Sequence, residues 1–165
     1  MAHNRLVGLG MALAALGIAA QTATGPDLQA PPTPPPPAFE VKRLIPIDMP
    51  KYVSLRFGVD PATLSIAPDG IVRYVVVAIS PTGSVTAMYE GIRCSAAEVK
   101  TFARYNTSAA NWSAVADPQW QRLNDNLPSK HALALAQQGL CEGRSTAVRS
   151  VPDLIKALTP SQNRF

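Results

Sequence analysis

Hydrophobic and polar positions in the middle of the chain follow a pattern that predicts an antiparallel sheet. Segment 71–79 (IVRYVVVAI) is β-branched or aromatic at most positions, which is typical of a strand. It is apolar on both faces apart from Arg73, so we expect it to lie centrally and to be covered twice. The flanking segments 67–70 (APDG) and 80–83 (SPTG) both place proline second and glycine fourth, which predicts tight turns.

The segments on either side of these turns complete a meander. Residues 64–66 form a short predicted strand and residues 85–94 a longer one, while the alternation over 52–57 predicts an edge strand. Segment 95–105 fits two patterns. It starts with a capping-box sequence and has apolar residues at helical spacing, but it also alternates with a period of two. The pattern alone supports a helix and a strand equally.

Helical spacing dominates the last part of the chain. Apolar residues recur every three or four positions from Leu127 until Gly139, with Asn126 as the expected N-cap. A second, shorter helix is expected from about Pro152 to Leu158 after a capping box. We therefore predict an α+β fold, with an antiparallel meander sheet of four or five strands and one or two helices packed on one face.

The N-terminus has the pattern of an export signal. Arg5 and the α-amino group precede 15 uncharged residues, 6–20, and no basic flank follows them. A membrane-spanning helix needs about 20 apolar residues, so this stretch is short for an anchor. We predict a signal peptide over 1–20, cleaved after Ala20 or Ala23. The alternative is an uncleaved segment, through which alone the protein would contact a membrane.

A proline-rich linker is expected after the signal. Seven of the 16 prolines fall between Pro26 and Pro37, where they favour extended polyproline II backbone. We interpret 21–38 as a semi-rigid spacer, with the alternative that it is a ligand for an aromatic groove. This leaves 39–160 as one globular domain, in keeping with a chain that is 47% hydrophobic and 16% charged.

The charge pattern argues against a nucleic-acid partner. The net charge is +4, and the densest basic cluster is the pair Lys42 and Arg43. Nucleic-acid binding requires a basic stripe with interleaved aromatic residues, which is missing here. We expect no nucleic-acid partner and a monomeric protein.

The two cysteines, Cys94 and Cys141, are predicted to form a disulfide, because an even count in an exported chain favours pairing. The loop-closure model gives such a bridge about 4 kcal/mol of stabilisation. A metal site would need more ligands than His131 adds, so we expect neither a metal nor a cofactor. A nucleophilic pair of Cys94 with His131 is the alternative, but it would leave Cys141 as an odd thiol.

Glu90 is the acidic residue with the least ordinary position, since it lies inside a predicted strand beside Tyr89. One interpretation is an outward-facing residue paired with a basic neighbour. The other is a carboxylate presented to a ligand. Arg93 should point to the opposite face, unless a bulge at Gly91 redirects one of the two side chains.

Trp112 and Trp120 flank the turn sequence at 117–118. Such a pair is typical of a core or a cross-strand contact, and a stacking platform for carbohydrate or peptide is the alternative. His131, near the start of a predicted helix, is interpreted as a surface residue. We assign no catalytic residue. The candidate ligand-facing residues are Tyr89, Glu90, Arg93, Trp112 and Trp120.

The chain resembles the cryptic neisserial protein family, which consists of small exported bacterial proteins. The resemblance lies in 73–77 (RYVVV) with 80–83 (SPTG), 89–94 (YEGIRC), 117–120 (DPQW) and the late 140–141 (LC). It covers roughly residues 40–160. It implies an envelope location and a strand after the first cysteine, and it supplies neither an activity nor catalytic residues.

These observations together predict a periplasmic protein of the cell envelope. The leading hypothesis is a non-enzymatic binding or accessory module that faces an envelope component from its sheet. The alternative is a small hydrolase that acts on an envelope polymer, with Glu90 as the acid or base.

Overall fold

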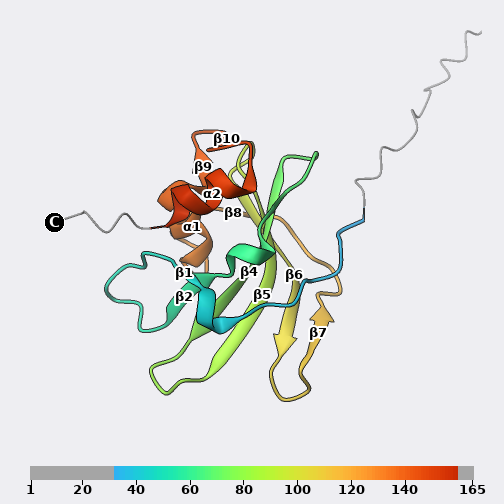
Figure 1. The fold of residues 1–165 in the computed structure, drawn as a ribbon, viewed down its shortest axis with the longest axis vertical. Helices are drawn as coiled ribbons and strands as arrows, with labels where there is room; N and C mark the ends of the chain where they lie inside the picture. The colour runs from blue at the N-terminus through green and yellow to red at the C-terminus, as the bar shows by residue number, and fades with distance from the viewer. Residues whose placement is uncertain (1–31, 160–165) are drawn as a thin grey trace, which may run out of the picture. The chain divides into compact units, whose positions relative to one another are not determined.

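An antiparallel sheet organises residues 32–159, the part of the chain that this computed structural model describes (Figure 1). The predicted signal peptide, its cleavage site and the first part of the linker lie outside the described residues. The strands follow the order β1-β2-β4-β5-β6-β7, with β3 also paired to β4 and β8 to β6. Their bounds are β1 Ile45–Pro46, β2 Arg56–Val59, β3 Ser65–Ile66, β4 Ile71–Ile79, β5 Val85–Arg93, β6 Glu98–Asn106, β7 Asn111–Ala114 and β8 Gln121–Arg122.

The predicted meander is confirmed, since β3, β4 and β5 pair in sequence order. All of β4 except its last residue is buried, as expected of a central strand covered on both faces. The predicted count of four or five strands is too low, because this sheet has eight. The strands β1, β3 and β8 contain two residues each, which is too few to produce a recognisable alternation.

Two segments differ from their simplest sequence interpretation. The strand expected over 52–57 is β2, which begins only at Arg56 and pairs with the second half of β4, but its predicted place at the edge is wrong because β1 pairs with its other side. The ambiguous segment 95–105 forms a turn and then β6, because residues 98–106 pair with β5 along its length. Period two therefore prevails over the helical pattern where a neighbouring strand supplies backbone partners.

Helices cover one face of the sheet, which we call the inner face. They are α1 (His131–Leu135), the π-type turn η3 (Ala136–Leu140) and α2 (Val151–Leu158). Their buried residues pack with those of β4 and β5 in one core: Ala132, Leu135, Ala136, Leu140, Leu154 and Leu158 with Val72, Tyr74, Val76, Ala78 and Ile92. The α+β class is thus confirmed, with the helices on one face.

The helix boundaries are partly as predicted. The helix expected from Leu127 begins only at His131, and its continuation η3 is distorted at Gly139, whose φ of 138° no ordinary side chain favours. The last helix starts after Ser150, whose hydroxyl accepts a hydrogen bond from the backbone N–H of Asp153. This is the predicted N-cap.

The predicted disulfide is present between Cys94, just after β5, and Cys141, at the start of the small hairpin β9 (Cys141–Glu142) and β10 (Ser145–Thr146). Their Cα atoms lie 5.6 Å apart, within the usual range for a bridge. The bridge joins the end of the helix layer to the end of a central strand. Within residues 32–159, no helix is both long and apolar enough to span a membrane.

Candidate functional site

Glu90 lies on the inner face of β5, in a buried polar network. The side chain opposite it on β4 is Tyr74, whose hydroxyl donates to Glu90 Oε2 at 3.2 Å. On β6 the Thr101 hydroxyl donates to Oε1 at 3.0 Å. From α1, His131 Nε2 lies 2.8 Å from Oε2. We call these residues, with Ser129, the Glu90 network.

His131 connects this network to the loop before α1. Its Nδ1 lies 2.6 Å from the hydroxyl oxygen of Ser129, and its ring stacks on Phe57 at a centroid distance of 4.9 Å. Glu90 is 2% exposed and His131 5% exposed, so water does not screen their interaction. The pair therefore joins α1 to the centre of the sheet in a dry environment.

Two opposing effects act on the pKa of Glu90. Burial raises it, because a dry environment disfavours the charged carboxylate. The attraction of His131 and the hydrogen bonds from His131, Thr101 and Tyr74 lower it, and together they prevail. The pKa of Glu90 is thus below its ordinary value, so the carboxylate is ionised at neutral pH. Burial and this negative charge hold the pKa of Tyr74 well above its ordinary value, so its hydroxyl keeps its proton.

The predictions of an outward-facing Glu90 and of a surface His131 are wrong, because both side chains are buried. Side chains alternate between the two faces along a strand, and Met88 and Ile92, two positions before and after Glu90, face the helices. The side chain of Glu90 therefore faces the helices as well. His131 is covered because α1 begins at this residue and lies against Phe57 of β2. A single histidine at a helix start has no sequence signal that distinguishes these environments.

A second cluster lies on the opposite, outer face of the sheet. The guanidinium of Arg93 lies 4.4 Å from the centroid of the Trp120 ring, and the ammonium of Lys100 lies 4.7 Å from the same centroid. The ring of Phe102 meets Trp120 edge-on at 6.5 Å. We call Arg93, Lys100, Phe102 and Trp120 the cation–aromatic site.

A β-bulge shapes this site. The pairing of β5 with β6 shifts between Tyr89 and Glu90, so that Phe102 is the extra residue of β6. Its ring lies over Gly91, where a Cβ atom would come within 2.9 Å of Phe102 and 2.8 Å of Ile71. Glycine at position 91 is therefore what allows the aromatic ring to lie flat against the strand.

The ion pairs of the cation–aromatic site leave an excess of positive charge. Glu98 accepts a 2.6 Å hydrogen bond from Arg93, and the residue opposite Glu98 on β8 is Arg122. Among residues 32–159, no carboxylate forms an ion pair with Lys100 or Arg122. Arg73, whose guanidinium lies 5.8 Å from the centroid of the Phe102 ring, is paired with Asp69 at 2.7 Å. Four cations thus accompany two carboxylates on this part of the outer face, an excess of two positive charges.

Another part of the outer face is covered by the segment 39–43, which directly follows the predicted linker and which we call the linker end. The Phe39 ring meets the rings of Tyr105 and Trp112 edge-on, at 5.0 and 5.8 Å. Phe39 also packs against the outer-face core of Val75, Val77, Ala87, Tyr89 and Ala103. Trp112 is therefore engaged within the chain and is not a free stacking platform.

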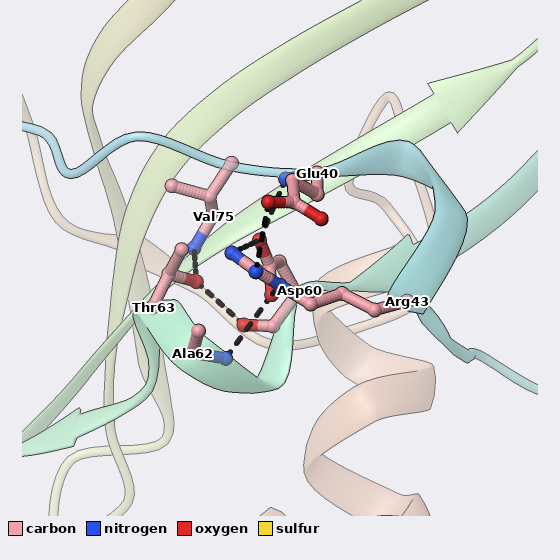
Figure 2. Close-up of polar contacts among 6 residues, drawn as sticks. All are labelled: Glu40, Arg43, Asp60, Ala62, Thr63 and Val75. Carbon is pink, nitrogen blue, oxygen red and sulfur yellow. Dashed lines mark hydrogen bonds and ion pairs between the residues drawn. The ribbon is translucent and has the colours of Figure 1, made fainter.

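Asp60 holds this linker end in place (Figure 2). Its fully buried carboxylate accepts from the backbone N–H of Glu40 at 2.8 Å and from that of Ala62 at 3.1 Å. Arg43 donates to both oxygens, at 2.5 and 2.8 Å. Burial raises the pKa of Asp60, but these donors outweigh it and lower the pKa overall.

The loop that carries Asp60 is itself fixed to the sheet. The Thr63 hydroxyl donates to the Asp60 carbonyl at 2.7 Å and accepts from the Val75 N–H of β4 at 2.9 Å (Figure 2). We call the contacts of Glu40, Arg43 and Asp60 the Asp60 clamp. The clamp has no local sequence signal, because an aspartate before Pro61 is an ordinary turn residue until its partners, 17 and 20 positions away, are known.

The candidate ligand-facing residues therefore separate into three places. Arg93 and Trp120 are together in the cation–aromatic site, and Tyr89 contacts Phe102 beside it at a centroid distance of 5.7 Å. Glu90 is on the inner face and Trp112 lies under Phe39. Lys100 and Phe102 also belong to the site, although no sequence pattern distinguished them from other strand residues.

Three hollows of the surface lie away from Glu90. One of about 750 Å³ lies between β1 and the C-terminal end of α2, and two smaller ones border α1 and the disulfide. None of the three is lined by Glu90 or by the cation–aromatic site. Within residues 32–159, no group of three His, Cys, Asp or Glu side chains is placed to hold a metal ion.

Comparison with known proteins gives one match. The family model described as CNP1-like family matches residues 24–159, which is most of the chain. No curated protein and no solved structure matches.

The lowered pKa of Glu90 makes stability depend on pH in a defined direction. The ionised carboxylate stabilises the fold fully above its ordinary value of 4.5, and this contribution is lost as the pH falls through the lower, folded-state value. We expect urea unfolding to show a steeper loss of stability between about pH 5 and about pH 3 in the wild type than in Glu90→Gln. Near neutral pH, Glu90→Gln should cost about 1–3 kcal/mol. The exposed Glu142→Gln should match the wild type, and equal slopes in all three proteins would contradict the assignment.

The Asp60 clamp predicts a protected cleavage site. Asp60→Asn removes the charge that holds Arg43, and a charged hydrogen bond of this kind contributes about 1.5–3 kcal/mol. We expect trypsin to cleave after Lys42 or Arg43 roughly ten times faster in Asp60→Asn than in the wild type. Asp117→Asn, which alters an exposed carboxylate, is the control. Equal rates in the two variants, read by mass spectrometry, would show that the clamp does not hold this segment.

Proposed function

We propose that this chain, which belongs to the CNP1-like family, is an exported binding module that docks on a component of the cell envelope through the outer face of its sheet. The proposal includes a periplasmic location and a role without catalysis. The narrower resemblance to the cryptic neisserial proteins stays a prediction.

The observation that carries this proposal is the cation–aromatic site itself. The inner face of the sheet packs against the helices, and part of the outer face packs against the linker end. The remaining part of the outer face presents Arg93, which is 37% exposed at its side chain, beside a partly exposed Trp120. Exposed tryptophan and arginine side chains are the residues most enriched at the energetic centres of protein interfaces.

The disulfide also supports an exported location. Disulfides persist in oxidising compartments and are rare in the cytosol. The bridge between Cys94 and Cys141 closes a loop with a sequence separation of 47 and joins two parts of the fold that carry no other covalent link. A compartment that keeps thiols reduced would prevent this bridge from forming, and the fold would lose its stabilisation.

The binding role predicts that contact with the partner is confined to one part of the surface. A photo-crosslinking residue at Gln119, exposed beside Trp120, should give a crosslinked product in cells that export the protein. The same residue at Lys51, exposed in the loop between β1 and β2, should not. Adding Trp120→Ala to the Gln119 variant should remove the product. Crosslinking from both positions alike, or from neither, would contradict the proposal.

The hydrolase alternative is supported by one observation: Ser129 contacts one ring nitrogen of His131, and Glu90 contacts the other. The ionised Glu90 carboxylate lies 2.8 Å from Nε2 of His131, and Nδ1 of the same ring lies 2.6 Å from the Ser129 hydroxyl oxygen. This is the order of a nucleophile, a base and an orienting carboxylate. In this hypothesis Glu90 orients His131 and Ser129 attacks, since Glu90 is too buried to be the acid or base.

This alternative makes its own prediction. A fluorophosphonate probe should form a covalent adduct on the partly exposed Ser129, detected by intact mass. Ser129→Ala should abolish the adduct and Ser113→Ala, on an exposed position of β7, should not. A protein that remains unlabelled, or that is labelled equally in the Ser129 variant, would exclude a nucleophilic serine here.

A further inference from the structure

The ring of Trp120 is already occupied by cations. Arg93 and Lys100 both lie over it at less than 5 Å from its centroid, and Phe102 meets its edge. A sugar ring or a nucleobase that stacks on tryptophan needs a free ring face. The site therefore presents the positive charges that the ring holds in place, and the ring is not the group that it offers to a ligand.

These charges are held together at an electrostatic cost. Lys100 of β6 lies opposite Gly91 and therefore diagonal to Arg93 on β5, and Arg122 lies opposite Glu98 on β8. Like charges at neighbouring sheet positions repel, and the single carboxylate of Glu98 neutralises only one of the three. The Nε of Arg93 is buried without a hydrogen-bond partner, because this part of the guanidinium lies against the ring. An anion bound at this site would relieve the repulsion.

We propose that the cation–aromatic site, together with Arg122, binds the phosphate groups of an anionic polymer. This inference rests on the proposed function, because it assigns the chemistry of the partner that the outer face binds. A carboxylate partner would have to replace Glu98, which is held beside Arg93 by the chain itself. Each phosphate of such a polymer carries a negative charge on two tetrahedrally arranged oxygens, which can accept from the planar Arg93 and from the point charge of Lys100 while Glu98 stays in place.

Inorganic polyphosphate is the direct probe, titrated into the purified exported chain with its disulfide intact. We expect saturable binding that weakens with salt, and an affinity at least about fivefold lower in Lys100→Gln. The slope of log K against log salt should fall by about one in this variant, for one lost phosphate contact. Lys51→Gln removes a lysine of equal charge from another part of the surface and should bind like the wild type. Equal losses in the two variants would overturn the inference.

Three further ligands identify the chemistry. Neutral dextran should not bind, and polygalacturonate, a carboxylate polymer compared at equal total charge, should bind more weakly than polyphosphate. Equal affinity for polyphosphate and polygalacturonate would show that the site does not prefer phosphate to carboxylate. A single-stranded oligonucleotide that bound tenfold more tightly than polyphosphate of equal charge would instead indicate nucleic-acid recognition.

The failure of this inference is distinguishable from that of the proposed function. If Gln119 crosslinks to a partner but polyphosphate does not bind, the outer face is a docking surface for another chemistry. If polyphosphate binds through Lys100 but no crosslink forms, the phosphate site exists and the docking role is wrong.

Discussion

The buried carboxylate of Glu90 is the group that constrains this structure most strongly. A charge removed from water is costly unless it is paired and hydrogen-bonded, and Glu90 obtains partners from β4, β6 and α1 at once. Three separate parts of the chain must therefore come together before this residue is accommodated. The disulfide holds the same two layers at another point, and the close approach of Gly139 to Ala157 lets the two helical segments lie against each other.

The strand β5 serves both faces of the sheet. Alternation directs Glu90 toward the helices and Arg93 toward the outer face, and the bulge between Tyr89 and Glu90 adds Phe102 to the outer face without disturbing the inner network. Glu90 of the buried pair with His131 and Arg93 of the cation–aromatic site thus lie three residues apart on the same strand. A side chain at position 91 would displace the Phe102 ring from its place over the strand. Trp120 would then lose its edge-on contact with that ring.

Much of the fold could be predicted from local patterns, whereas the sites depend on long-range contacts. The apolar run of β4, the Ser150 cap and the pairing of the only two cysteines each leave a signal within a few residues or in a simple count. The cation–aromatic site joins residues of β5, β6 and the segment before β8, and its register depends on a bulge that no local pattern indicates. Similarly, His131 is buried because of where α1 packs, and Asp60 has its role because the linker returns to it. Strands of two residues are too short for any periodic signal.

The central claim is that Glu90 and His131 stabilise the fold through their direct interaction. A double-mutant cycle with Glu90→Gln, His131→Asn and the combined variant, measured by urea unfolding at pH 7, tests it most directly. Residues in one buried hydrogen-bonded pair should show an interaction free energy of about 1–3 kcal/mol, so that the second substitution costs much less once the first is present. Strictly additive effects of the two substitutions would show that the carboxylate and the imidazole stabilise the protein independently, and would contradict the account.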